Sequence, residues 1–282
     1  MSVRLNPDLL PTLLASIQDS KQSETISTQQ LASGRSVNQL SDNPAASASL
    51  VQNHDRAAAD GQFLQNLSTL QSKYQVADST LDNVVSALTR ALSLGVEGAN
   101  GTLTAADRQA IAGKVQGLLN RTVSLATTTY QGTFLFAGTK VSTQPFTLDT
   151  TTNAVTYNGN SAATSVELSN GDSIRANLPG NQLFQNASGS VTGALQHLYN
   201  ALSTGTNIPA SVTEVQNALT QVSQQRVFYG NNLNQISLSE SFLNQDKLNL
   251  SQQENGLVGA DLTTLNATAR VLGLPTLLDF LK

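Results

Sequence analysis

The stretch LASGRSVNQLSDNPAASASL, residues 31–50, contains a break in an otherwise helical pattern. Gly34 ends one helical stretch, and SDNP at residues 41–44 has the pattern of a new helix start. The Asp or Asn side chain in this tetrapeptide can accept hydrogen bonds from the first free amides of a helix, and Pro44 suits the first turn because its missing N–H costs nothing there. We therefore expect a bend between Gly34 and Pro44.

On the N-terminal side of this bend, residues 5–31 carry an apolar stripe at helical spacing. The stripe is narrow, and in its second half only Ile26 is strongly apolar. A helix with so narrow a stripe is marginal when isolated in water, so we expect another helix or another subunit to cover it. The residues predicted to serve this assembly contact are Leu9, Leu13 and Ile17.

Beyond the bend, apolar residues recur in alternating steps of four and three from 63 to 91, which is typical of a coiled-coil seam. The seam residues predicted for the core of a helical rod are Phe63, Leu67, Leu70, Tyr74, Leu81, Val84 and Leu88. Glycines near residue 100 end this helix, and TAAD at 104–107 resembles a capping box. The cap predicts a second helix, antiparallel to the first, that continues to about residue 125.

The helical period disappears over residues 132–185, where Gly, Asn, Thr and β-branched residues are frequent. We expect a small β insert here, with short strands and its own small core. Asn-Gly pairs at 158–159 and 170–171 are predicted hairpin turns. A short helix over 193–202 follows the strands.

The longest coiled-coil pattern covers residues 212–257. Its predicted core residues are Val215, Leu219, Val222, Leu233, Ile236 and Leu243. Four seam positions are charged instead of apolar: Arg226, Glu240, Lys247 and Glu254. The three in the second half of the seam, 240, 247 and 254, form either a simple ion-pair face or, as we prefer, a deliberately weak seam that neighbouring subunits complete.

After Leu257 the seam shifts by one residue, which changes the buried face and predicts a change of partner. Residues predicted to serve assembly in this terminal segment are Leu262, Leu265, Leu272, Leu277, Leu278, Phe280 and Leu281. The N- and C-terminal helices are expected to pair with each other, because each has a stripe and neither has another local partner.

These patterns predict a mostly α fold: a long antiparallel coiled-coil rod from N- and C-terminal helices, with a small β domain in the middle. The predicted divisions are an inner helix and bend (1–42), the two parts of the rod (43–131 and 209–257), a β-rich insert with a short helix (132–208) and a C-terminal inner helix (258–282).

Composition excludes several classes of function. Charged residues are 12% of the chain, about half the usual share, and the net charge is −4 without a basic run, which argues against nucleic acid as a partner. No apolar stretch approaches the length of a membrane span, so membrane insertion is not expected. The chain has no cysteine, and neither His54 nor His197 has a carboxylate cluster near it in the sequence. No catalytic or nucleotide-binding motif stands in a suitable context, so no enzyme activity, metal or cofactor is expected.

The order of these features resembles the flagellin superfamily. Residues 31–50 are similar to the family's signature around the N-terminal bend, and ALTRALSLGVEGANGTLTAADRQAIAGKVQGLL (87–119) resembles its shared helical core. GTFLFAGTK (132–140) and VTYNGN (155–160) resemble the passage of the family's junction subunits into their β domain. RVFYGNNLNQI at 226–236 matches the family's C-terminal pattern, and the ending LPTLLDFL resembles the junction tail more than the filament tail.

The resemblance implies a self-assembling, non-catalytic subunit between the hook, through the hook-associated protein FlgK, and the flagellin filament. Other copies of the chain in a ring and an export chaperone are further implied partners. The implied location is extracellular, after export through the flagellar type III apparatus without a cleaved signal peptide. The resemblance also places Gly34 to Pro44 at the spoke, the segment that connects an inner coiled coil with an outer rod. A filament subunit remains an alternative, and an enzyme or glycan-binding module in the insert is a remote one.

Overall fold

The computed structural model describes residues 9–39, 41–168, 171, 173–186, 189–261, 263 and 267. They belong to two compact units. One unit contains Met1–Gly61 and Asn244–Lys282, and the other contains Gln62–Leu243.

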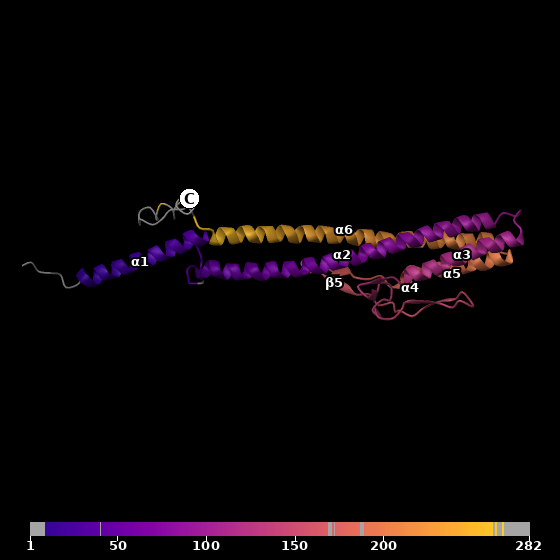
Figure 1. Cartoon of the computed structure of the whole chain (residues 1–282), viewed down its shortest axis with the longest axis horizontal. Coiled ribbons are helices and arrows are strands. Elements are labelled where there is room, and N and C mark those ends of the chain that lie inside the picture. The colour runs from indigo at the N-terminus through magenta and orange to yellow at the C-terminus, as the bar shows by residue number, and fades with distance from the viewer. Residues whose placement is uncertain are drawn as a thin grey trace, which may run out of the picture. The chain divides into compact units, whose positions relative to one another are not determined.

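The larger unit is built on four helices (Figure 1). They are α2 (Pro44–Gly98), α3 (Ala105–Ala126), α5 (Val191–Thr204) and α6 (Ile208–Val258), of which α2 and α6 continue into the smaller unit. Within the larger unit α2 and α6 run antiparallel, since Tyr74 contacts Tyr229 while Gly95, later in α2, approaches Val212, earlier in α6. The helix α3 packs along α5.

The seam residues of both long helices lie mostly in the interior of this unit. Ten of the thirteen are buried: Leu67, Leu70, Tyr74, Leu81, Val84, Leu88, Val215, Val222, Ile236 and Leu243. The remaining three, Phe63, Leu219 and Leu233, are partly buried and pack against the same core. Tyr74 and Tyr229 meet edge to face with ring centroids 5.2 Å apart, and their burial raises the pKa of both hydroxyls.

The start of α3 confirms the predicted capping box. Thr104 Oγ1 accepts a hydrogen bond from the backbone N–H of Asp107 at 3.2 Å, and the Thr104 N–H donates to Asp107 Oδ2 at 3.2 Å. The two bonds satisfy two backbone donors at the helix start. The side-chain hydrogen bond from Thr104 to its carboxylate lowers the pKa of the exposed Asp107.

Two glycines near the end of α2 allow close helix packing. A Cβ at Gly98 would clash with the side chain of Leu202 on α5. At Gly95, which lies inside the helix, a Cβ would come within 2.7 Å of Val212 Cγ2 on α6. These glycines therefore let α5 and α6 approach α2 closely. This packing role comes in addition to the helix-ending role predicted from the sequence.

The segment between α3 and α5 forms four small antiparallel hairpins among the described residues. They are β1 (Thr129–Tyr130) with β2 (Thr133–Phe134), β3 (Phe146–Leu148) with β4 (Val155–Tyr157), β5 (Ser165–Glu167) with β6 (Ser173–Arg175), and β7 (Gln185–Asn186) with β8 (Gly189–Ser190). A short helix, α4 (Gly180–Phe184), lies among them. The fold is therefore mostly helical with a few small strand pairs in the middle of the chain, as predicted.

Of the two predicted Asn-Gly hairpin turns, one is wrong. Gly171, with φ +84°, does lie between β5 and β6. The β3–β4 turn instead covers residues 149–154, where Asp149 Oδ1 accepts the N–H of Thr151 at 2.8 Å, and this bond lowers the pKa of the exposed Asp149. Gly159 follows β4, at a place where a Cβ would clash with the hydroxyl of Tyr157.

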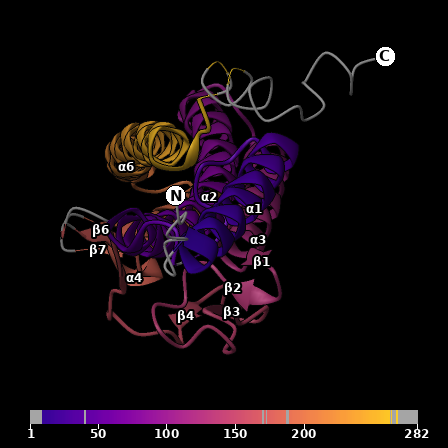
Figure 2. The ribbon, with the colours of Figure 1, turned by 90° about the vertical axis from the view of Figure 1, so that its left-hand side faces the viewer.

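The prediction that the insert has its own small core is also wrong. Phe146 of β3 and Phe184 of α4 are fully buried with ring centroids 5.3 Å apart, and they belong to one continuous core with α3 and α5. The β3–β4 turn is bound to both helices: Gln116 Nε2 of α3 donates to Asn153 Oδ1 at 3.1 Å, and Gln196 Nε2 of α5 donates to Thr152 O at 3.2 Å. In the view of Figure 2, β2, β3 and β4 lie at the bottom and β6 and β7 lie at the left, near α4.

Candidate assembly surfaces

The predicted bend is a loop ordered by local hydrogen bonds. The helix α1 (Leu9–Ser33) ends at Gly34, which has φ +68° and donates its N–H to Gln30 O at 2.8 Å. Asn43 is the side chain that caps α2, because its Oδ1 accepts the N–H of Ala46 at 3.0 Å. Asp42 stabilises the loop itself by accepting the N–H groups of residues 38 and 39 at 2.9 and 2.8 Å.

The same loop is attached to the end of α6. Ser36 N donates to Val258 O at 2.6 Å, Ala260 N donates to Gly34 O at 3.1 Å, and Arg35 pairs with residue 259 as an antiparallel bridge. An ion pair supports these bonds, with Arg35 Nη2 3.2 Å from Glu254 Oε1. The bend thus joins segments from opposite ends of the sequence within the smaller unit.

Each histidine faces a single carboxylate and not a cluster. His54 Nε2 lies 3.7 Å from Glu254 Oε1, and His197 Nδ1 lies 2.6 Å from Glu214 Oε2. The spacing in the sequence could not show this, because both carboxylates come from α6, whereas His54 lies on α2 and His197 on α5. Both histidine side chains remain well exposed, in keeping with solvated roles.

The smaller unit holds a buried carboxylate on the inner face of α2. Asp60 is 5% exposed and faces Asp246 of α6. Arg56 partly neutralises the pair, since its Nε and Nη2 donate to the two Asp246 oxygens at 2.9 and 3.2 Å. Burial, and then the hydrogen bond and negative charge of Asp246, raise the pKa of Asp60.

Two of the charged seam positions, Arg226 and Glu254, make ion pairs. Arg226 donates to Asp78 and Asp82 of α2, and Glu254 accepts from Arg35. Lys247 is exposed. For the positions 240, 247 and 254, the bond of Glu254 to Arg35 supports the ion-pair face at that one position, and the choice between the two interpretations stays a prediction.

The first half of α1 exposes an apolar stripe. Leu10, Leu13, Leu14 and Ile17 are 71%, 55%, 58% and 47% exposed. Two predicted assembly residues, Leu13 and Ile17, therefore lie on open surface. The side chain of Leu9 and all seven predicted residues of the terminal segment, from Leu262 to Leu281, lie outside the described residues.

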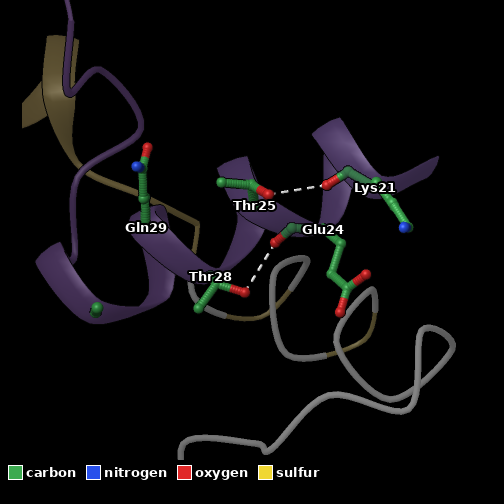
Figure 3. Close-up of a pocket in the computed structure, with 6 residues that line it drawn as sticks. Lys21, Glu24, Thr25, Thr28 and Gln29 are labelled. Atoms are coloured by element: carbon green, nitrogen blue, oxygen red, sulfur yellow. Dashed lines mark hydrogen bonds between the residues drawn. The ribbon is translucent and has the colours of Figure 1, made fainter. Parts of the chain in front are cut away.

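Further along α1, a hollow is lined by residues of that helix (Figure 3). They are Lys21, Glu24, Thr25, Thr28, Gln29 and Ala32. Both threonine hydroxyls are used inside the helix: Thr25 Oγ1 donates to Lys21 O at 2.9 Å and Thr28 Oγ1 donates to Glu24 O at 2.8 Å. This hollow offers apolar surface and no convergent catalytic groups.

Within the described part of the chain, no three His, Cys, Asp or Glu side chains gather as a metal site would require. No helix there is long and apolar enough to cross a membrane.

Comparison with known proteins identifies the N-terminal helical part. Residues 11–141, which run from α1 through the bend, α2 and α3 to just past the first hairpin, match the bacterial flagellin N-terminal helical region. This part of the chain is similar to the flagellin family. The flagellin-type region thus contains both the exposed stripe of α1 and the capped bend.

Relatives of the chain are hook-associated proteins. Flagellar hook-associated protein 3 of Escherichia coli K12 is 33% identical over 119 residues, which are 42% of this chain and 38% of that protein. The same protein of Salmonella typhimurium LT2 is 30% identical over a match with the same two shares. The matches thus span about two fifths of the length of these curated relatives.

Solved structures show the same fold at lower identity. A Vibrio parahaemolyticus protein, provisionally described as a flagellar hook-associated protein, has a TM-score of 0.71 at 22% identity, covering 77% of this chain and all of that one. Xanthomonas campestris FlgL has a TM-score of 0.64 at 19% identity, covering 72% of this chain and 99% of its own. The flagellin-type region of this chain therefore continues into a fold shared with hook-associated proteins.

Proposed function

We propose that the chain is a non-catalytic structural subunit of the bacterial flagellum that forms the junction between hook and filament. The observation that carries this proposal is the combination of a flagellin-type helical region with a fold shared, over nearly the whole of the compared chains, with hook-associated proteins. The relatives named hook-associated protein 3 support the junction position.

The exposed stripe of α1 supports assembly as the role of the N-terminal helix. Leucine and isoleucine side chains that remain about half exposed or more gain stability when a neighbouring subunit covers them. In the proposed junction, FlgK lies on the hook side, flagellin on the filament side and further copies of the chain beside it in a ring. The absence of cysteine suits export as an unfolded chain through the type III apparatus, with a chaperone before export.

A filament subunit is the second candidate, because the matched helical region takes its name from flagellin itself. The two candidates differ in where the protein lies and in how many copies a flagellum holds. Immunogold labelling of purified flagella separates them: the junction assignment predicts label at the base of the filament only, and a filament subunit would be labelled along its whole length.

A deletion strain tests the role in assembly. Cells without the gene should make hooks without filaments, and the full-length chain supplied from a plasmid should restore filaments. Normal filaments in the deletion strain would refute a junction role. Secreted flagellin in the culture medium would show that export itself continues.

Point variants of α1 test the surface in the same strain. Leu13→Ser with Ile17→Ser removes two exposed apolar side chains without disturbing a buried core, so the variant should be secreted but should restore few or no filaments. Gln18→Ser with Ser20→Ala on the same exposed helix is the matched control and should restore them. Full motility of the leucine–isoleucine variant would show that the stripe does not serve assembly.

A further inference from the structure

Three Asn-Gly dipeptides lie among the described residues, and their surroundings differ. The pair 100–101 lies in the exposed turn between α2 and α3, the pair 158–159 follows β4, and the pair 255–256 lies inside α6. At an Asn-Gly pair a chain reacts readily with itself, because glycine has no Cβ to shield its backbone nitrogen from the preceding side chain. The surroundings of each pair therefore decide whether this reaction can occur.

The reaction is the loss of ammonia from the asparagine side chain. The backbone nitrogen of the glycine attacks the asparagine Cγ and gives up its proton to water, so a new N–Cγ bond closes a five-membered ring that carries a negatively charged oxygen. The bond from Cγ to Nδ2 then breaks, and the nitrogen takes up a proton and leaves as ammonia. Water opens the resulting succinimide at either carbonyl, which gives aspartate or isoaspartate. The chain needs only a free backbone and a polarised side-chain carbonyl.

The side-chain carbonyl of Asn100 is polarised by Thr102. Asn100 Oδ1 accepts two hydrogen bonds from this residue, one from the backbone N–H at 3.1 Å and one from Oγ1 at 3.0 Å. These bonds fold the side chain back along the following backbone, as in an Asx-turn. Negative charge develops on Oδ1 when Cγ is attacked, so the two donors act on it as an oxyanion hole does.

The turn around Gly101 leaves room for the attack. The Gly101 N–H has no hydrogen-bond acceptor among the described residues, and a Cβ built there meets nothing within 4 Å. The flanking backbone bonds, Asn100 N to Glu97 O and Leu103 N to Asn100 O, are both 3.2 Å, which is longer than the usual value of about 2.9 Å. An exposed turn with such bonds can rotate at little cost.

The half-buried pair at 158–159 lacks both features. Asn158 uses its Nδ2 to donate to Thr147 Oγ1 at 3.2 Å, and its Oδ1 accepts from no donor among the described residues. The backbone of Gly159 is enclosed, because a Cβ there would clash with the hydroxyl of Tyr157 and come within 2.8 Å of Ala137 O. The nitrogen of Gly159 therefore cannot turn toward Cγ without breaking this packing.

The pair at 255–256 is exposed but helical. A helical backbone directs the nitrogen of residue 256 toward the carbonyl of residue 252, four residues earlier, and away from the preceding side chain. Attack at this pair requires the helix to open first. The pair therefore separates the effect of exposure from the effect of backbone freedom.

We propose that Asn100 is a site of spontaneous deamidation, in which the nitrogen of Gly101 attacks and Thr102 stabilises the oxyanion. The reaction adds one negative charge to the net charge of −4. In the aspartate product the carboxylate can keep both bonds from Thr102. In the isoaspartate product the main chain is one carbon longer, so the bonds that order the turn before α3 are lost. The inference goes beyond the proposed function, because it concerns the covalent structure of the chain and not its place in an assembly.

Peptide mapping of the full chain tests this site. Trypsin cuts after Lys and Arg and places the three pairs on separate peptides, 91–108, 141–175 and 248–270. The folded protein is incubated at neutral pH and physiological temperature, and its peptides are analysed by chromatography and mass spectrometry. Asn100 should convert to aspartate and isoaspartate at least about tenfold faster than Asn158 and Asn255. Conversion of Asn100 no faster than that of the other two would refute the proposal.

Unfolding provides a control within the same chain. In urea above the unfolding transition the three pairs lose their different surroundings, so their rates should become similar. An excess rate at Asn100 that persists undiminished in urea would show that the fold does not cause it, and would overturn the structural argument.

Variants of the exposed residue 102 test the two donors. Thr102→Val removes the hydroxyl but keeps the backbone N–H, and should slow the conversion of Asn100 about five- to tenfold, as expected for the loss of one hydrogen bond. Thr102→Ser is the matched control, because it keeps the hydroxyl, and should react at the rate of the unaltered chain. An unchanged rate in Thr102→Val would refute the role of Thr102 in the reaction.

Discussion

Arg226 of α6 lies opposite Asp78 of α2 in a two-pronged ion pair. Its Nε donates to Asp78 Oδ1 at 2.9 Å and its Nη2 donates to Asp78 Oδ2 at 3.2 Å. The remaining guanidinium nitrogen, Nη1, bonds a second carboxylate by donating to Asp82 Oδ1 at 2.6 Å. The guanidinium occupies a position where the seam repeat calls for an apolar residue, so the repeat is interrupted by a specific contact between the two helices.

Replacing this arginine tests the strength of that contact. Arg226→Ala leaves Asp78 and Asp82 one turn apart with no cation between them, and should lower the free energy of unfolding by about 1–2 kcal/mol in urea titrations. The value is modest because the side chain is 30% exposed. Arg226→Lys keeps the positive charge but loses the planar guanidinium that bonds two carboxylate oxygens at once. Its free energy of unfolding should therefore lie between those of the unaltered protein and Arg226→Ala. Equal stability of all three proteins would show that the ion pair contributes nothing.

Glycine substitutions separate close packing from helix propensity. Gly98→Ala places a methyl group against Leu202 and should destabilise the protein by about 1–3 kcal/mol, although alanine is the better helix former. Gly113→Ala in α3 is the control, since a Cβ there meets nothing within 4 Å, and should stabilise by about 0.5–1 kcal/mol. Thermal unfolding measures both changes. Stabilisation by both substitutions would mean that Leu202 moves aside without cost.

The long helices could be predicted because their information is local and repeats many times. Leu81 and Ile236 recur at heptad spacing with their neighbours, and both are fully buried. The caps at Thr104 and Asn43 could also be predicted, since a cap is a contact within four residues. The charge at Arg226 was recognised as an exception, but its partners on α2 are almost 150 residues away and leave no local pattern.

The insert was less predictable for a related reason. The Asn-Gly pair at 158–159 has the composition of a hairpin turn, but Gly159 is used for close packing beside Tyr157. Strands of two or three residues give too little alternation to show which face is covered, so the shared core around Phe146 could not be inferred. The divisions at residues 42 and 258 stay predictions.

Asp60 should make stability depend on pH. Its pKa is raised above the ordinary 3.8 in the folded protein, so the buried carboxyl is accommodated most easily when protonated. Its contribution to stability is therefore full below the unfolded pKa and is lost as pH rises through the folded pKa. Asp60→Asn removes that loss, and should raise the melting temperature at pH 7 while having little effect near pH 3.

The control for this variant is Asp55→Asn, which replaces an exposed carboxylate on the same helix. It should leave the difference in melting temperature between pH 7 and pH 3 unchanged. A lower melting temperature for Asp60→Asn at pH 7 would show that ionised Asp60 is stabilised by Arg56 and Lys247 more than it is penalised by burial and by Asp246.

Removing one aromatic side chain should show that the insert and the helices share a core. Phe146 is fully buried between Tyr157 and Phe184, with ring centroids 5.0 and 5.3 Å away, and β3 packs on α3. Phe146→Ala should cost about 3–5 kcal/mol and should increase hydrogen exchange in α3 and α5 as well as in the strands. Val141→Ala, at an exposed position of the insert, should change neither.

The shared core also predicts the effect of removing the insert. Replacing residues 140–185 by a Gly-Ser linker should destabilise α3 and α5, because that segment covers them. Faster exchange confined to the strands would instead mean that the insert unfolds independently and that its core is separate after all.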